Sequence, residues 1–233
     1  MSKPRLSDYD FCKAAKRLKC EVAAIKAVAQ IESLGSGFYS DGFPTILFER
    51  HVFYKYVKAR SAADARKWSE EYPQICNRES GGYGAAGQNQ RNKFNLAYSL
   101  DPTAAMLACS WGKFQVMGFN HKLVGFKTVN SFVDAMKESE GRHLEAFVEY
   151  VISTGLSDEL RGKQWAAFAS GYNGAGYKKN AYDVKMANAY KKFAKQTVDC
   201  DQVKPQTVNV APAEIPKPAN TDTQNQVVTE VKE

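Results

Sequence analysis

Residues 21–33 read Glu21-Val22-Ala23-Ala24-Ile25-Lys26-Ala27-Val28-Ala29-Gln30-Ile31-Glu32-Ser33, and this stretch contains the most informative residue of the chain, Glu32. Its apolar residues recur at the spacing of an amphipathic helix, with Ile25, Val28 and Ala29 seven, four and three positions before Glu32. That spacing places the Glu32 carboxyl on the helix face that points toward the core. Glycines at positions 35 and 37 then predict the end of the helix.

The position of Glu32 predicts an unusual ionisation. It lies at the negative end of the helix dipole and at the edge of a hydrophobic core, and both effects disfavour the charged carboxylate. A carboxyl that stays protonated near neutral pH is suited to act as the general acid of a glycosidase. A solvated glutamate in a last helical turn, or one paired with an arginine, would give the same short pattern. Other segments of the chain must therefore support the functional interpretation.

Length and composition bound the class of protein. The chain has 233 residues, enough for one domain with a core plus extensions, and its 44% hydrophobic and 24% charged content is typical of a globular protein. No apolar run is long enough to span a membrane. Residues 1–8 hold no hydrophobic stretch, so we expect no secretory signal and folding in the cytoplasm of the cell that makes the chain.

The cysteines and histidines predict neither a disulfide framework nor a metal site. The cysteines are odd in number and form no CxxC pair, so we expect reduced thiols at Cys12, Cys20, Cys76, Cys109 and Cys200. The histidines do not cluster with Cys or Asp at metal-ligand spacing. We therefore expect no metal and no cofactor.

Charge is unevenly distributed along the chain. The net charge is +7, but residues 196–233 carry six acids and three lysines, a net −3, which leaves +10 for residues 1–195. A basic folded domain favours an anionic partner such as nucleic acid, an acidic membrane surface or an acidic cell-wall polymer. An excess of lysine that serves solubility alone would give the same number.

The periodicity predicts a mainly α chain with a small β element. Residues 45–48 favour a short strand, and the glycine-rich residues 77–92 favour a mobile loop. Residues 1–195 are expected to form one domain. Residues 196–233 are rich in Pro, Thr, Asn and Gln, so we expect them to form a disordered tail. Helices are expected at 8–19, 21–33, 51–58, 62–71, 96–109, 129–138, 144–153, 163–170 and 181–194.

Three further segments carry groups suited to sugar chemistry. Ile46-Leu47-Phe48-Glu49-Arg50-His51 ends a short strand with a second acid. Ser110-Trp111-Gly112-Lys113-Phe114-Gln115-Val116-Met117-Gly118-Phe119 offers an amide at Gln115 and a flat ring at Trp111, although Trp111 could equally belong to the core. Ser170-Gly171-Tyr172-Asn173-Gly174-Ala175-Gly176-Tyr177 presents Tyr172 and Asn173 on a glycine-flanked corner, which is also a common way to end a helix.

These segments together resemble the lysozyme-like superfamily of peptidoglycan glycosidases. Glu32-Ser33 is similar to the catalytic Glu-Ser of goose-type lysozymes and lytic transglycosylases, and residues 112–116 to their Gly-x-x-Gln segment. Residues 172–176 resemble their Tyr-Asn-Ala-Gly segment with one extra glycine. A narrower resemblance, to the phage endolysin N-acetylmuramidase family, rests on residues 28–33, 47–51 and 110–118 in order, and covers about residues 7–194.

The resemblance implies a lysozyme-like α+β fold, a helical bundle around a substrate cleft with a small β element. It implies a peptidoglycan hydrolase that cleaves between N-acetylmuramic acid and N-acetylglucosamine, and Glu32 as its general acid. Glu49 is the first candidate for the second catalytic carboxylate, and Asp41, in an Asp-Gly turn, is the other. The residues expected to bind substrate are Trp111, Gln115, Tyr172 and Asn173.

Several outcomes stay open at this point. The spacing of the two carboxyls decides between retention and inversion, with goose-type similarity favouring inversion, and a missing second acid would favour a transglycosylase that forms an anhydro-sugar. We expect a monomer that binds peptidoglycan and an anionic wall surface, remains in the host cytoplasm until lysis and binds no nucleic acid. A helix-turn-helix near residues 19–21 and a non-catalytic wall-binding protein are the rival interpretations.

Overall fold

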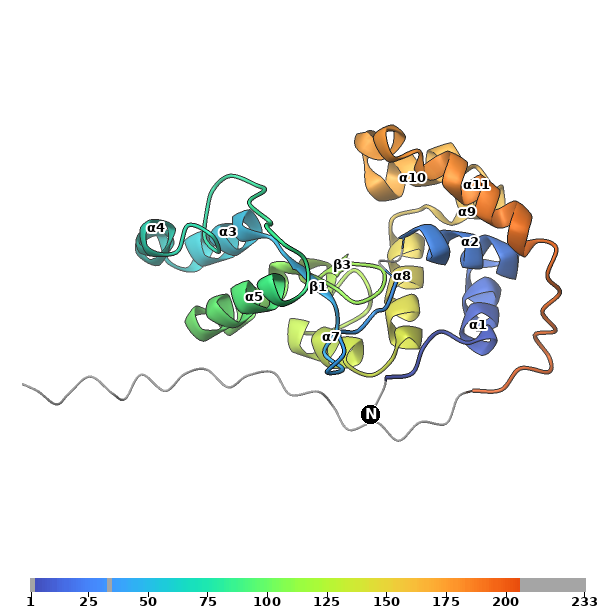
Figure 1. Cartoon of the computed structure of the whole chain (residues 1–233), viewed down its shortest axis with the longest axis horizontal. Coiled ribbons are helices and arrows are strands. Elements are labelled where there is room, and N and C mark those ends of the chain that lie inside the picture. The colour runs from blue at the N-terminus through green and yellow to red at the C-terminus, as the bar shows by residue number, and fades with distance from the viewer. Residues whose placement is uncertain (1–2, 33–34, 206–233) are drawn as a thin grey trace, which may run out of the picture.

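The computed structural model describes residues 3–32 and 35–205. Within these ranges the chain is mainly helical and contains a small antiparallel sheet, which confirms the predicted fold class. Figure 1 shows two groups of helices on either side of this sheet. No helix in the described part combines the length and apolar character needed to cross a membrane.

The first two helices form as the sequence predicts. α1 (Asp8–Leu18) begins at Ser7, whose hydroxyl accepts the Asp10 amide while the Asp10 carboxylate accepts the Ser7 amide. It ends at Lys19, which adopts the left-handed conformation with φ of 55°. α2 (Val22–Glu32) buries Ile25 and Val28, so its apolar face is the one that the spacing indicated.

The sheet joins segments that lie far apart in sequence. β1 (Ile46–Phe48) pairs with β2 (Cys109–Trp111), which pairs with β3 (Val116–Met117), and both pairings are antiparallel. In this register Ile46 lies opposite Trp111, and Trp111 lies opposite Val116. The turn between β2 and β3 therefore lies beside the start of β1, where the Gly112 amide donates to Thr45 O at 2.7 Å, and residues of this turn and of β1 contribute to the site.

The predicted helix at 96–109 is wrong. The structure has α5 (Gln88–Leu100), then α6 (Pro102–Leu107), and then β2. Asp101 is extended with φ of −149° because a residue before proline avoids the helical region, and its carboxylate caps α6 by accepting the Ala104 amide at 2.9 Å. α5 also begins inside the range expected to be a glycine-rich loop.

The other helices lie in two groups around the sheet (Figure 1). One contains α3, α4, α5 and α6, and the other contains α1, α2 and the later helices, among which α11 packs along α2 and α8 packs against α1. The bounds are α3 (Arg50–Arg60), α4 (Ala62–Glu71), η1 (Gly118–Asn120), α7 (Val129–Met136), α8 (Glu140–Ser153), α9 (Ser157–Arg161), α10 (Trp165–Asn173), η2 (Ala175–Asn180) and α11 (Tyr182–Phe193).

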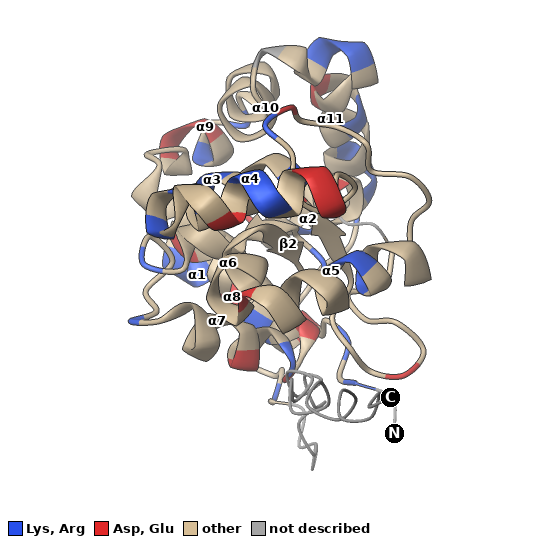
Figure 2. Cartoon of the chain, turned by 90° about the vertical axis from the view of Figure 1, so that its left-hand side faces the viewer, with Lys and Arg blue, Asp and Glu red and all other residues tan. Residues whose placement is uncertain are grey.

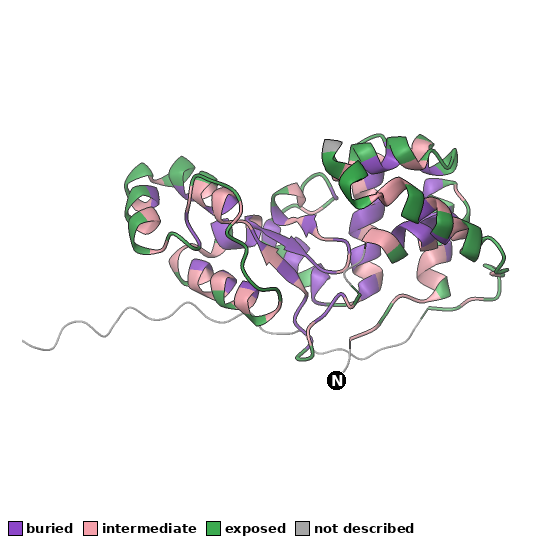
Figure 3. Ribbon diagram, turned by 45° about the horizontal axis from the view of Figure 1, so that its top comes forward, coloured by how far each residue is buried: buried purple, intermediate pink, exposed green. Residues whose placement is uncertain are grey.

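Buried residues are continuous from the sheet into both groups of helices (Figure 3). Trp111 has no exposed surface and packs against Phe43 and Phe94, with ring centroids 6.0 and 5.4 Å away. On the other side, Phe114 stacks on Phe147 of α8 at 4.8 Å. The β2–β3 segment therefore links the two groups, because its aromatic side chains enter both halves of the core.

Two predictions about the cysteines and the C-terminal segment need correction. Cys12 and Cys200 form a disulfide, so the expectation of reduced thiols is wrong at these two positions. The bond spans 188 residues, and such a long separation gives no local sequence signal. Residues 196–205 are described and lead from α11 back to α1, so the segment expected to be disordered from residue 196 is tied to the domain at Cys200. Residues 206–233 lie outside the described residues.

Candidate active site

Glu32 is the last residue of α2 and is half-buried. Burial raises the pKa of its carboxyl, and the amide of Asn173, which donates to Glu32 Oε1 over 2.8 Å, partly offsets that rise. The carboxyl thus lies where its protonated form is favoured. Ser33, the second residue of the Glu-Ser pair, lies outside the described residues.

Tyr172 and Asn173 reach Glu32 from α10, more than a hundred residues away in sequence. Asn173 is the last residue of this helix, which stops before Gly174 with φ of 74°. The Tyr172 hydroxyl donates to the carbonyl of Phe114 at 3.1 Å. Burial raises the pKa of this phenol, and the nearby Glu32 carboxylate adds to the rise. The phenol therefore stays neutral and ties α10 to the β2–β3 turn.

Glu49 lies between β1 and α3, as the N-cap residue of that helix. Its backbone amide donates to Ala108 O at 2.9 Å, which fixes the residue beside β2. The carboxylate is 15% exposed, and its Oε2 lies 3.2 Å from His51 Nδ1. Burial raises the pKa of the Tyr83 phenol, and the nearby Glu49 carboxylate raises it further. An imidazole and a phenol therefore flank this second acid.

Gln115 occupies the turn between β2 and β3 in a strained conformation, with φ of 51°. Its side-chain amide is held on both sides, because Oε1 accepts the Ser110 hydroxyl at 2.6 Å and Nε2 donates to Gly112 O at 2.7 Å. The amide orientation is therefore fixed before any ligand binds.

A single cavity of about 850 Å³ brings these residues together. Glu32, Glu49, Gln115, Tyr172 and Asn173 all line it, so the structure unites five of the residues singled out from the sequence. The remaining lining residues are Leu47, Tyr83, Ser110, Phe114, Val116, Met117, Asn120, Tyr150 and Tyr182. Two carboxyls, amides and aromatic rings around one cavity are chemical groups suited to glycan cleavage and binding.

Asp41 and Trp111 do not line this cavity. Asp41 pairs with Arg91, and its Oδ1 accepts the Phe43 amide at 3.0 Å. Burial raises the pKa of Asp41, but the Phe43 amide and the Arg91 guanidinium outweigh burial and leave it below its usual range. Trp111 is fully buried, and its indole donates to Met106 O at 3.0 Å. Trp111 was expected to contact the substrate, but the structure places it in the core. Asp41 belongs to a turn outside the cavity.

Sequence reasoning missed three tyrosines of the cavity. Tyr83 comes from the glycine-rich loop, and Tyr150 and Tyr182 come from α8 and α11. The segment was predicted to be a mobile loop, but Tyr83 within it was not singled out. Lys93 and Gln90 hold the loop by donating to the Tyr83 carbonyl at 2.8 and 2.7 Å. Tyr150 and Tyr182 follow ordinary helical patterns and gave no separate signal.

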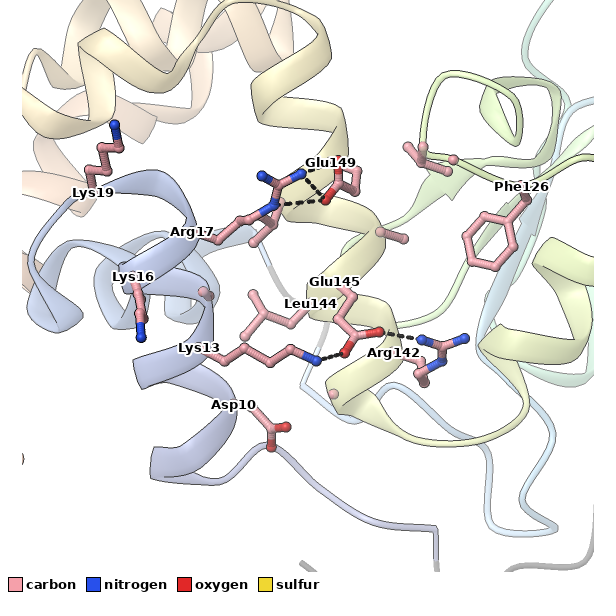
Figure 4. Close-up of a pocket in the computed structure, with 16 residues that line it drawn as sticks. Asp10, Lys13, Lys16, Arg17, Lys19, Phe126, Arg142, Leu144, Glu145 and Glu149 are labelled. Carbon is pink, nitrogen blue, oxygen red and sulfur yellow. Dashed lines mark hydrogen bonds and ion pairs between the residues drawn. The ribbon is translucent and has the colours of Figure 1, made fainter. Parts of the chain in front are cut away.

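A second cavity, of about 860 Å³, lies between α1 and α8 (Figure 4). Its acidic side chains already have partners, since Glu145 binds Lys13 and Arg142, Glu149 binds Arg17, and Asp10 accepts the amide and hydroxyl of Ser7. None of the predicted site residues lines it. Across the described residues, no group of three or more His, Cys, Asp or Glu could hold a metal ion. The cavity around Glu32 is therefore the candidate active site.

Comparison with known proteins identifies the family of the chain. The N-acetylmuramidase family matches residues 21–194. The chain belongs to the N-acetylmuramidase family. It is also similar to the crystal structure of the Burkholderia AP3 phage endolysin, with 41% sequence identity and a TM-score of 0.77 over 82% of this chain and 73% of that chain. No curated protein matches the chain.

Membership of the muramidase family settles the class of activity. The chain is a lysozyme-type glycoside hydrolase, a peptidoglycan hydrolase of the phage endolysin kind, and peptidoglycan is its substrate. The matched range contains every residue that lines the cavity around Glu32. The cavity is thus part of the segment that defines the family.

Proposed function

We propose that this muramidase cleaves the glycan bond between N-acetylmuramic acid and N-acetylglucosamine, with Glu32 as general acid. The observation that carries the proposal is the half-buried Glu32 carboxyl, which has a raised pKa and faces the same cavity as Glu49. Glu32 donates its proton to the glycosidic oxygen as the bond to the anomeric carbon breaks. Asn173 holds the carboxyl in place through one oxygen.

Glu49 is the second carboxylate of the proposed reaction. It comes from the end of β1, a different element from the Glu32 helix, and it lines the same cavity. In an inverting reaction Glu49 accepts a proton from the attacking water. His51 and Tyr83, which flank Glu49, orient its carboxylate. Gln115 and Asn173 supply amides for the hydroxyl and N-acetyl groups of the sugars, and Tyr172 holds the β2–β3 turn.

A transglycosylase outcome is the second candidate. The position of His51 favours it, because its Nδ1 lies 3.2 Å from Glu49 Oε2 and occupies a side of the carboxylate at which a water could be activated. In that reaction the sugar's own hydroxyl attacks the anomeric carbon and leaves an anhydro product.

Mass spectrometry of the muropeptides released from purified sacculi tests the proposal. We expect hydrated products with N-acetylmuramic acid at the reducing end. Anhydro products, lower in mass by one water, would establish the transglycosylase outcome. N-acetylglucosamine at the reducing end would contradict the proposed bond.

Binding to an anionic wall surface is a further part of the proposal. Exposed lysines gather on η2 and α11 next to Tyr182 of the cavity, and Figure 2 shows α11 with several basic positions. They are Lys178, Lys179, Lys185, Lys191 and Lys192. Electrostatic attraction of this kind weakens as salt rises. Sacculus binding should therefore fall steeply with added salt, and salt-independent binding would remove this part of the proposal.

The cellular route and the oligomeric state also belong to the proposal. We propose a monomer that is made in the host cytoplasm and reaches the wall at lysis. The Cys12–Cys200 bond fits a protein that works after it leaves a reducing compartment. Trapping of free thiols before and after lysis tests this: a bond present before lysis would contradict the cytoplasmic stage, and light scattering reports the mass in solution.

A further inference from the structure

Two polar side chains of α8 are buried behind the cavity. Glu140 is 2% exposed and His143 is 1% exposed, and both lie in the first turns of this helix. Neither residue lines the cavity around Glu32, and the proposed reaction does not use them. Buried charged groups are rare unless they are paired, so their contacts need an explanation.

Glu140 holds the chain that follows the Glu32 helix. Its Oε1 accepts the backbone amide of Gly37 at 2.8 Å, and its Oε2 accepts that of Leu6 at 3.1 Å. Gly37 comes five residues after Glu32, which ends α2. The carboxylate thus anchors the exit of the catalytic helix to α8.

Lys113 connects this anchor to the turn that carries Gln115. Its ammonium lies 3.4 Å from Glu140 Oε1 and also donates to Gly35 O. Its side chain is only 14% exposed. Because Lys113 comes two residues before Gln115, one side chain joins the turn that carries Gln115 to residues 35–37, which follow Glu32 in the chain.

His143 holds the same turn through the backbone. Its Nδ1 accepts the Lys113 amide at 3.0 Å, so its proton is on Nε2, which donates to Met136 O at 2.6 Å. The ring is also tightly enclosed, since a Cβ added at Gly37 or at Gly112 would lie 2.7 Å from an imidazole atom. The backbone at Gly37 and the backbone at Gly112 therefore both lie in close contact with the His143 ring.

We propose that Lys113, Glu140 and His143 form a positioning clamp that sets the placement of Glu32 relative to Gln115. The inference rests on the proposed function, because it assumes that Glu32 donates the proton. The three residues do not touch substrate. They act by keeping the end of α2 and the β2–β3 turn at a fixed separation, and small displacements of catalytic groups slow a reaction strongly.

Lys113→Met tests the clamp, with Lys13→Met as the matched control. Lys113→Met keeps most of the aliphatic stem and the backbone bond to His143 but loses the ammonium. Lys13 makes an exposed ion pair with Glu145 on the opposite face of α8. Both variants are assayed on soluble glycan fragments well below their melting temperatures. We expect kcat to fall roughly 10- to 100-fold in Lys113→Met, with KM changed less than about threefold, and no change in Lys13→Met.

Two substitutions of Glu140 should lower kcat to different extents. The amide oxygen of glutamine still accepts one backbone N–H, so we expect Glu140→Gln to retain more kcat than Glu140→Ala. If Lys113→Met and Glu140→Gln fold and keep kcat within about twofold of wild type while Glu32→Gln is inactive, the clamp is refuted and the proposed function stands. Failure of Lys113→Met to fold shows a structural role and also refutes the clamp. Activity in Glu32→Gln would instead overturn the proposed function.

Discussion

Two carboxyls face one cavity from different surroundings. Glu32 ends a helix, is half-buried and receives one neutral amide bond, whereas Glu49 lies beside an imidazole and a phenol. Partly desolvated surroundings favour a protonated carboxyl. In the proposed division between an acid and a base, the raised pKa of Glu32 suits that carboxyl to the acid role.

The pH–rate profile should reveal this division. Because burial raises the pKa of Glu32, the fraction in the protonated, active form should persist above the ordinary range of a glutamate, near 4.3. We expect a bell-shaped dependence of kcat/KM whose basic limb reports Glu32. Initial rates on sacculi from about pH 4 to pH 10 measure it. A rate that still rises above about pH 9 would contradict a carboxyl proton donor.

Substitution of the two candidate second acids should separate their roles. Glu49→Gln should lower the rate by roughly 100-fold or more in a folded protein, because a group placed in the cavity loses its charge. Asp41→Asn should leave the rate near wild type and lower the melting temperature slightly, because it weakens a partly exposed pair with Arg91. Turbidity loss and melting temperature are measured for both variants on one sacculus preparation. The reverse pattern would assign the chemistry to Asp41.

At the scale of elements, α8 should make stability depend on pH. Burial lowers the pKa of His143 to about 4, whereas an unfolded histidine titrates near 6.5. Below pH 6.5 the unfolded chain therefore binds a proton that the folded chain rejects, so stability falls as the pH drops toward 4. Between pH 7 and pH 4 the free energy of unfolding therefore falls by about 3 kcal/mol.

Urea unfolding at pH 7, 5 and 4 measures this dependence. His143→Gln should lose that part of the pH dependence, while His121→Gln, which alters a half-buried histidine elsewhere, should keep it. Equal pH slopes in wild type and His143→Gln would show that His143 does not carry the effect.

The elements show what the sequence could predict. α1, α2 and β1 were predictable because a capping serine, the helical period and a short β-prone run are local signals. β2 and β3 were not, because a two- or three-residue strand has too few positions for a period, and one of the two pairing partners of β2, the strand β1, lies over sixty residues away. Tertiary pairing overrode a helical pattern that ran past Pro102.

In the candidate site, too, local motifs could be read from the sequence and tertiary contacts could not. Glu32, Glu49, Gln115, Tyr172 and Asn173 could be named because each belongs to a short motif, and the structure places them around one cavity. Trp111 could not be assigned from sequence because an aromatic side chain suits a core and a sugar-binding wall equally well. Lys113 and Glu140 gave no signal, because their pairing depends on the packing of α8 behind the site.

At the scale of the whole molecule, one bond closes almost the entire described chain. The Cys12–Cys200 disulfide encloses a loop of 188 residues, and closing so long a loop stabilises the folded state by about 5 kcal/mol in the chain-entropy model. Cys12→Ser should therefore lower the melting temperature by roughly 10–20 °C under oxidising conditions and leave activity at 25 °C intact. Scanning calorimetry with and without reductant measures the effect.

Controls for this prediction are available in the same chain. Cys20→Ser should change little, since Cys20 is a free thiol whose pKa burial raises to about 11. A chain that ends at Pro205 keeps the disulfide, whereas one that ends at Lys195 loses it, so only the shorter chain should melt lower. Equal melting temperatures for wild type and Cys12→Ser in oxidising buffer would refute the stabilising role.

We propose above all that Glu32 is the proton donor, and the variant Glu32→Gln removes the proton that it would donate. An amide cannot donate the proton, so the initial rate of sacculus lysis should fall roughly 100- to 10,000-fold at equal folded concentration. Burial raises the pKa of Glu32, so ionising it costs the native state stability as the pH rises. The variant should therefore melt at the wild-type temperature or slightly above it at pH 7. A folded Glu32→Gln protein that keeps more than about a tenth of the wild-type rate would contradict the claim.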